Sequence, residues 1–168
     1  MGKENIVLGD GVFSIGATPV GLTRGGGSFT IEREYRQIEA DGDRGPVKGR
    51  IRKIKGIAKL AMNALELLPA NLQKMYPAVT VTTETGVDTM TGKADIEDAD
   101  YNATVTWTGK TKTGRGVVIT LKNAINLENI DWPLVDKDEI IAKVTYTATY
   151  TEDARETEPW DVVWAAVS

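Results

Sequence analysis

The sequence predicts a mainly β protein: an antiparallel β-sandwich or open barrel with one short flanking helix and a long projecting hairpin. Short β-branched runs recur between turn residues, which is typical of antiparallel sheets. Across residues 139–150, apolar and polar side chains alternate, so one face of a strand meets the core and the other meets water. Residues 69–76 alone combine helical spacing with a proline at the first turn and a proline that ends it.

Composition excludes several kinds of chemistry. The chain has 168 residues with no cysteine and no histidine, which rules out disulfides, thiolate nucleophiles, Ser-His-Asp catalysis and the usual zinc ligand sets. We therefore expect no enzyme activity, no cofactor and no metal. The length fits a single domain spanning residues 1–168, and no run approaches the ~20 apolar residues of a membrane span. These features predict a soluble protein made in the cytoplasm, without a membrane partner.

The longest predicted element is a hairpin over residues 28–64. Its arms meet at residues 39–46, which include Asp-Gly and Gly-Pro turn pairs. The incoming arm alternates through Phe29 and Ile31, then changes phase to reach Tyr35 and Ile38, which predicts a β-bulge or a twist. At roughly 3.3 Å per residue, the arms are about as long as a compact domain of this size is wide, about 40 Å. The tip should therefore project.

The remaining segments are expected to be shorter. They comprise a flexible N-terminal arm at residues 1–8 with an apolar anchor at Ile6-Val7-Leu8, a flexible glycine joint at 25–27, a strand at 79–83, a polar loop at 84–100, a hairpin of strands 101–108 and 116–122, and a last strand at 160–164.

Charge is segregated along the chain, although the net charge is only −4. Seven basic residues and no acidic ones lie from Arg44 to Leu65, whereas residues 84–100, and again residues 152–161, are rich in acids. Two such surfaces are complementary between copies of one chain. The candidate contact residues are Asp41, Asp43, Arg44, Lys48, Arg50, Arg52, Lys53 and Lys55 on the hairpin, with Asp95, Glu97, Asp98 and Asp100 as the acidic partner patch.

Other interpretations of these residues remain open. The hairpin cations could be a solvated face whose lysines discourage edge-to-edge aggregation. The four acids could hold calcium, yet their spacing lacks the glycine and terminal bidentate glutamate of the known calcium loop. Four tryptophans, Trp107, Trp132, Trp160 and Trp164, could supply stacking surfaces for a small β-sandwich binding or adhesion module with a carbohydrate or protein ligand.

Several local patterns occur together in a familiar order. Residues 39–49 precede a long basic strand, followed by Asn63-Ala64-Leu65, then Pro69-Ala70-Asn71-Leu72, and finally Glu158-Pro159-Trp160 before a terminal strand. In this order they resemble the major tail tube proteins of long-tailed bacteriophages, over most of the chain. The resemblance implies a β-sandwich flanked by a helix, hexameric rings whose inner strands form a continuous barrel, and a hairpin that stacks one ring on the next.

The same resemblance implies a function and partners. The chain would be a structural virion protein of the tail, assembled in the host cytoplasm, with residues 41–52 as the stacking element and the 1–8 arm as a second linker. Its partners would be further copies of itself and the tape measure, tail tip and tail terminator proteins. DNA would pass through the lumen without tight binding, which agrees with the acidic net charge.

Overall fold

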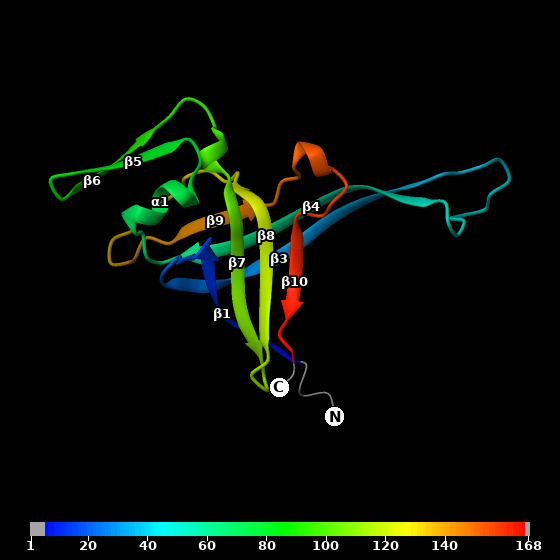
Figure 1. Cartoon of the computed structure of the whole chain (residues 1–168), viewed down its shortest axis with the longest axis horizontal. Coiled ribbons are helices and arrows are strands. Elements are labelled where there is room, and N and C mark those ends of the chain that lie inside the picture. Colours follow the sequence, from blue (N-terminus) through cyan, green and yellow to red (C-terminus); the bar gives the residue numbers. More distant parts are fainter. Residues whose placement is uncertain (1–5, 167–168) are drawn as a thin grey trace.

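The computed structural model describes residues 6–166 (Figure 1). Its elements are β1 (Val7–Ile15), β2 (Thr18–Pro19), β3 (Thr23–Gln37), β4 (Ile51–Ala64), α1 (Pro69–Met75), β5 (Val79–Glu84), β6 (Val87–Gly92), β7 (Asn102–Thr111), β8 (Gly116–Asn126), β9 (Ala142–Thr147) and β10 (Trp160–Trp164). Two single 3₁₀ turns, Asp98–Asp100 and Glu152–Ala154, complete the set. Within the described residues, no helix combines the length and apolarity that crossing a membrane requires.

The strands form two antiparallel layers that share β8. The order of hydrogen-bonded strands is β2-β1-β7-β8-β9-β4-β3. Strand β10 pairs with the same edge of β8 as β9 does, but with a different part of β8. Residues 117–121 of β8 pair with β10, whereas Ile125 and Asn126 pair with β9. Asn123, between these stretches, adopts a positive φ of 49°, so the strand changes direction as it passes from one layer to the other.

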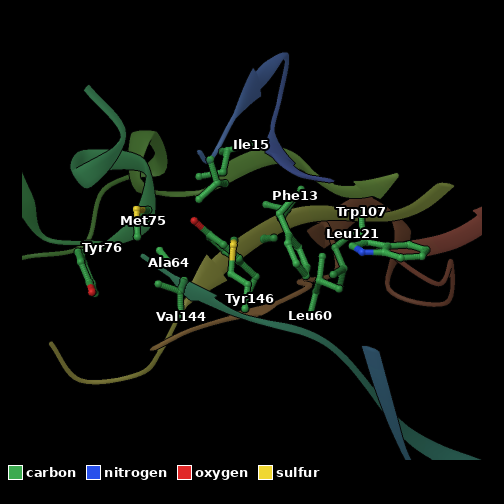
Figure 2. Packing of buried hydrophobic residues seen from close by; sticks show 14 of the residues in the cluster. Phe13, Ile15, Leu60, Ala64, Met75, Tyr76, Trp107, Leu121, Val144 and Tyr146 are labelled. Carbon is green, nitrogen blue, oxygen red and sulfur yellow. The ribbon is translucent and has the colours of Figure 1, made fainter. Parts of the chain in front are cut away.

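The core lies between the layers. Apolar side chains from β1, β4, β7, β8 and β9 meet there, and Figure 2 shows Phe13, Leu60 and Leu121 directed toward one another. On β9, Ala142, Val144 and Tyr146 are fully buried while Lys143 between them is exposed. The predicted alternation of that strand is therefore confirmed, although the strand is shorter than residues 139–150.

The helix covers one end of the sandwich. Pro69 stands at its first turn, and its last carbonyls are satisfied from the sheets. Asn102 donates to Lys74 O at 2.8 Å, Asn126 donates to Met75 O at 2.9 Å, and the Tyr146 hydroxyl donates to Lys74 O at 3.3 Å. Because helix ends leave carbonyls without intrahelical partners, these contacts fix the helix on the strands.

The predicted fold class is confirmed. Within residues 6–166 the protein is mainly β and antiparallel with one α-helix, and it is consistent with a β-sandwich, but its sheets do not close into a barrel. The long hairpin is formed by β3 and β4, and its tip projects from the body to the right in Figure 1. The helix, the strand at 79–83, the hairpin of β7 and β8 and the last strand also lie where the sequence predicts them.

The prediction of a glycine joint at residues 25–27 is wrong. These residues belong to β3, where the pairing shifts between Thr23 and Gly27, and Gly25 and Gly26 have positive φ values of 85° and 73°. A Cβ on Gly27 would lie 2.8 Å from the Phe13 ring and closer still to the Ala61 carbonyl oxygen. The glycines therefore allow a bulge and a close strand approach rather than flexibility.

Two further predicted segments, residues 84–100 and 1–8, both contain strand residues. Residues 84–100 are not a continuous loop, because β6 pairs with β5 across a turn at Thr85 and Gly86, both with positive φ. The predicted arm at residues 1–8 falls partly outside the described residues, which begin at 6. Its described part, residues 6–8, is the apolar anchor of the arm and is attached to the sheet: β1 begins at Val7, which pairs with Thr111, and Lys112 N donates to Ile6 O at 2.9 Å.

Candidate functional site on the projecting hairpin

The hairpin has a buried half and an exposed half. Near the body, Ala58, Leu60, Met62 and Ala64 of β4 are 0–3% exposed and belong to the core. Beyond Gly56, every residue of the two arms except Arg50 is exposed out to the tip. The outer half therefore extends past the surface that the rest of the chain can cover (Figure 1).

A bulge separates the two halves. Glu34 pairs with Lys55, but its neighbour Tyr35 pairs with Lys53, so Ile54 is an extra residue on β4. A bulge is present, as the sequence predicts, but it lies on the outgoing arm; on the incoming arm Tyr35 stays in phase with Phe29 and Ile31, so the expected change of phase does not occur before Tyr35. Because an extra residue reverses the alternation of a strand, Lys53 and Ile51 share the face of Tyr35, which continues the core face of β3.

Glu158 fastens the hairpin to the C-terminal part of the chain. Its carboxylate accepts hydrogen bonds from Lys53 Nζ, from the Tyr150 hydroxyl at 3.0 Å and from Trp160 Nε1 at 3.2 Å. The Tyr150 hydroxyl also lies 3.2 Å from Gly56 O. Lys53 holds the pKa of Glu158 below its ordinary value, and Glu158 raises the pKa of Lys53. The outer hairpin thus leaves the body from a charged, hydrogen-bonded base.

The tip has contacts of its own. Asp43 Oδ2 accepts hydrogen bonds from Ala40 N and from Arg50 Nη1, both at 2.8 Å. Ile38 N donates to Arg50 O at 2.9 Å, so the ladder continues past the last strand residue, Gln37. Asp43 and Arg50, predicted as contacts between copies, therefore support the shape of the tip.

Four of the predicted cations remain available for other contacts. Arg44, Lys48, Arg52 and Lys55 are exposed and form no ion pair with any residue in 6–166, and Asp41 beside them is also exposed. Lys53, in contrast, is paired with Glu158. The hairpin thus carries a set of uncompensated positive charges on an extended support.

Charge-based sequence analysis missed the apolar residues of the same element. Tyr35, Ile38, Ile51 and Ile54 are about half exposed, and Val47 is 36% exposed. The signal was present in the sequence, since these large side chains interrupt the basic run, but their exposure depends on how far the hairpin projects. Apolar and cationic side chains together are typical of a surface that binds another protein.

The predicted acidic patch is largely engaged within the chain. Asp100 is buried, accepts a hydrogen bond from Glu97 N at 2.8 Å and lies 3.3 Å from Lys93 Nζ, which also pairs with Glu97. Backbone hydrogen bonds and Lys93 keep the pKa of Asp100 below its ordinary value in spite of desolvation. Of the four acids in this patch, Asp95 and Asp98 form no ion pair within residues 6–166. Among the same described residues, no group of three or more acidic side chains is placed so that it could hold a metal ion.

Three of the four tryptophans are engaged in packing. Trp107 is in the core, Trp132 donates from Nε1 to the Tyr76 hydroxyl at 3.0 Å, and Trp160 packs edge-on against Phe29. Trp164, at the end of β10, is about half exposed. The described tryptophans therefore do not gather into one stacking platform.

No protein-family model and no curated protein matches this chain. The hairpin and its surroundings are therefore interpreted from their own geometry and chemistry.

The base of the hairpin should respond to acid through Glu158. Because its folded pKa lies below the ordinary 4.5, its stabilising contribution is present above that value and is lost as the pH falls through the folded pKa. We expect Glu158→Gln to lower stability at pH ~7 by about 1 kcal/mol, the scale of a half-exposed charged hydrogen bond. Thermal unfolding of both proteins against pH measures the difference, which should disappear in acid. A difference independent of pH would contradict the role of the charge.

Proposed function

We propose that this protein is a structural subunit that self-assembles into stacked rings and forms the tail tube of a phage or a phage-derived particle, a conduit for DNA. The observation that carries the proposal is the outer hairpin. Its own hydrogen bonds and the Glu158 contacts hold it in shape, yet it leaves large apolar side chains and unpaired cations exposed. A monomer gains nothing from such an element, whereas an assembling subunit gains a docking arm.

The mode of assembly follows from asymmetry. A projecting arm docks on a surface unlike itself, and such a heterologous contact repeats without closing unless a rotation closes it into a ring. Stacking through the hairpin would extend the tube, while a second, lateral contact would close each ring. The edge of β3, which pairs only with β4 in the sheet path, is available for a lateral contact. The hexameric number comes from the family resemblance alone.

The resemblance supplies the rest of the proposal. The tube would lie in the virion tail, after assembly in the host cytoplasm, and would meet tape measure, tail tip and tail terminator proteins. No catalytic step is part of this function. The rival function, a small binding or adhesion module, gains no support from the positions of the four tryptophans.

Electron microscopy of the purified chain at increasing concentration tests the proposal. We expect rings or tubes whose number grows with concentration, and a matching rise in light scattering. A chain that remains monomeric at every concentration, with the sandwich folded, would contradict self-assembly.

A conduit should not retain the DNA that passes through it. With a net charge of −4, the chain releases few counterions on binding a polyanion, so we expect affinity for duplex DNA weaker than about 1 μM at physiological salt. Fluorescence anisotropy with labelled duplex measures this, and Arg52→Ala with Lys55→Ala serves as a comparison. Tight, salt-sensitive binding that this variant abolishes would identify the hairpin as a nucleic-acid site instead.

A further inference from the structure

We propose that the loop between β8 and β9, residues 127–139, is the surface on which the hairpin of a second copy docks. This inference rests on the proposed function and names the receiving surface of the stacking contact. The sequence singles out the acids of residues 84–100 for that role, and the structure indicates this other loop, here called the 127–139 loop.

The first reason is exposed apolar area. Leu127, Ile130, Leu134 and Val135 are all exposed, with Leu134 82% exposed. Large aliphatic side chains grouped in one loop and surrounded by acids form a patch of the kind that is buried in protein contacts. Nothing within residues 6–166 covers them.

The second reason is that the 127–139 loop is held in place. Its start follows Asn126, which is buried and bound to Met75 O, and its centre is fixed by Trp132 against Tyr76. Its end is tied by an ion pair between Glu139 and Arg24 at 3.1 Å. A loop fixed at three points loses little conformational entropy when a partner binds, so its apolar residues are displayed in advance.

The third reason is charge complementarity. Four acids in the loop, Glu128, Asp131, Asp136 and Asp138, form no ion pair within residues 6–166, and Lys137 is the loop's one cation. The outer hairpin carries the cations Arg36, Arg44, Lys48, Arg52 and Lys55, which form no ion pair within residues 6–166, alongside the unpaired acids Glu34, Glu39 and Asp41. Each surface also presents aliphatic residues, so a contact would bury apolar area inside a rim of opposite charges.

The fourth reason is position. Figure 1 places the 127–139 loop, dark yellow, on the side of the body that carries α1, away from the hairpin tip, with the β5–β6 hairpin extending further in that direction. Complementary surfaces at two different places on one subunit produce a heterologous, head-to-tail contact that can propagate from copy to copy. The residues 84–100 are a weaker receiver, because Lys93 already neutralises Glu97 and Asp100.

Charge reversal on either surface provides the first test. Asp131→Lys with Asp136→Lys reverses two loop side chains that make no hydrogen bond or ion pair in the described residues, and Arg52→Glu with Lys55→Glu reverses the hairpin. Each double variant alone should need at least about tenfold higher concentration to assemble, since like charges meet at every contact. An equal mixture of the two should assemble again, because each hairpin then finds a loop of opposite charge on the other variant.

The matched control is Asp95→Lys with Asp98→Lys, which reverses the other acidic loop and should assemble as the parent does. If the parent forms tubes and the 127–139 loop variant forms them equally well, the loop assignment is wrong and the proposed function stands. If the mixture does not recover, the two surfaces do not meet. If the parent itself never assembles, the proposed function and the docking surface both fail.

Disulfide trapping provides a second test that does not depend on charge. The chain has no cysteine, so Val47→Cys with Leu134→Cys introduces only the two thiols of interest. Because the hairpin tip and the 127–139 loop lie on different sides of the body (Figure 1), oxidation under assembly conditions should link separate chains and give a ladder on a non-reducing gel. The control, Val47→Cys with Ile96→Cys, should give no ladder beyond a dimer. A ladder from the control and none from Leu134→Cys would overturn the inference.

Discussion

Replacing residues 38–50 by Asn-Gly is expected to abolish tube formation while the subunit still folds. Gln37 and Ile51 are paired across β3 and β4, and a two-residue Asn-Gly turn joins paired strand ends in the register that they already have. All the removed side chains are exposed or, for Arg50, half-buried, so the free energy of unfolding should change by less than about 1 kcal/mol. Assembly should fall to background, because Ile38, Val47, Arg44 and Lys48 leave together.

Thermal unfolding and light scattering on the same samples measure the two effects. The matched control shortens the other exposed hairpin, replacing residues 83–88 by Asn-Gly between the paired Thr82 and Thr89. That variant loses a similar exposed tip from β5 and β6 and should still form tubes. Normal tubes from the 38–50 variant would remove the hairpin from the stacking contact, whereas loss of cooperative unfolding would mean that the tip supports the monomer.

The parts of the fold that the sequence predicts are those governed by local patterns. Residue alternation located β9 and the pairing of β7 with β8, because burial of one face of a strand imposes a period that is visible in a few residues. The helix was located by the two prolines that bound it. A bulge in the hairpin was predicted from a change of phase in β3, but β3 keeps its alternation through Tyr35 and the extra residue is on the partner strand. Its location on β4 at Ile54 could not be read from β3 alone, since register is a property of two strands.

The errors have long-range causes. Gly25-Gly26-Gly27 has the composition of a joint, but the close approach of Phe13 and Ala61 to Gly27 involves segments distant in sequence. The same limit applies to charges: Lys53 is paired with Glu158, which is remote in the sequence, and Lys93 with the buried Asp100. A sequence shows how many charges a segment carries, whereas the fold determines which of them remain unpaired.

The candidate site was predicted in location and only partly in composition. The hairpin and its basic character were visible, and four of its predicted cations are exposed without ion pairs in the described residues. The exposed aliphatic residues and the 127–139 loop were not predicted, because an apolar residue in a sequence is by default assigned to the core. The aliphatic residues of the hairpin are exposed because the outer hairpin extends beyond the body, and those of the 127–139 loop are exposed while Trp132 in that loop packs against Tyr76.

The packing of Trp107 should make Gly109 of β7 intolerant of a larger side chain. Trp107 points into the core, and Gly109 follows two residues later on the same face, paired with Gly11 of β1. A Cβ on Gly109 would lie 2.8 Å from Cζ2 of the indole and closer to Cη2, well inside van der Waals contact. Gly109 has no positive φ, so Gly109→Ala introduces this clash without backbone strain. We expect a loss of about 2 kcal/mol, the range of overpacked cores.

A double-mutant cycle separates this clash from other effects of the alanine. Trp107→Ala alone should cost about 3–5 kcal/mol through the cavity that it leaves. In that background Gly109→Ala should become neutral or stabilising by up to about 1 kcal/mol, because the added Cβ has room and alanine loses less backbone entropy than glycine on folding. Denaturant unfolding of the parent, both single variants and the double variant gives the coupling. Additivity within about 0.5 kcal/mol would show that the indole yields to the new methyl group, and that Gly109 is not required to accommodate the ring.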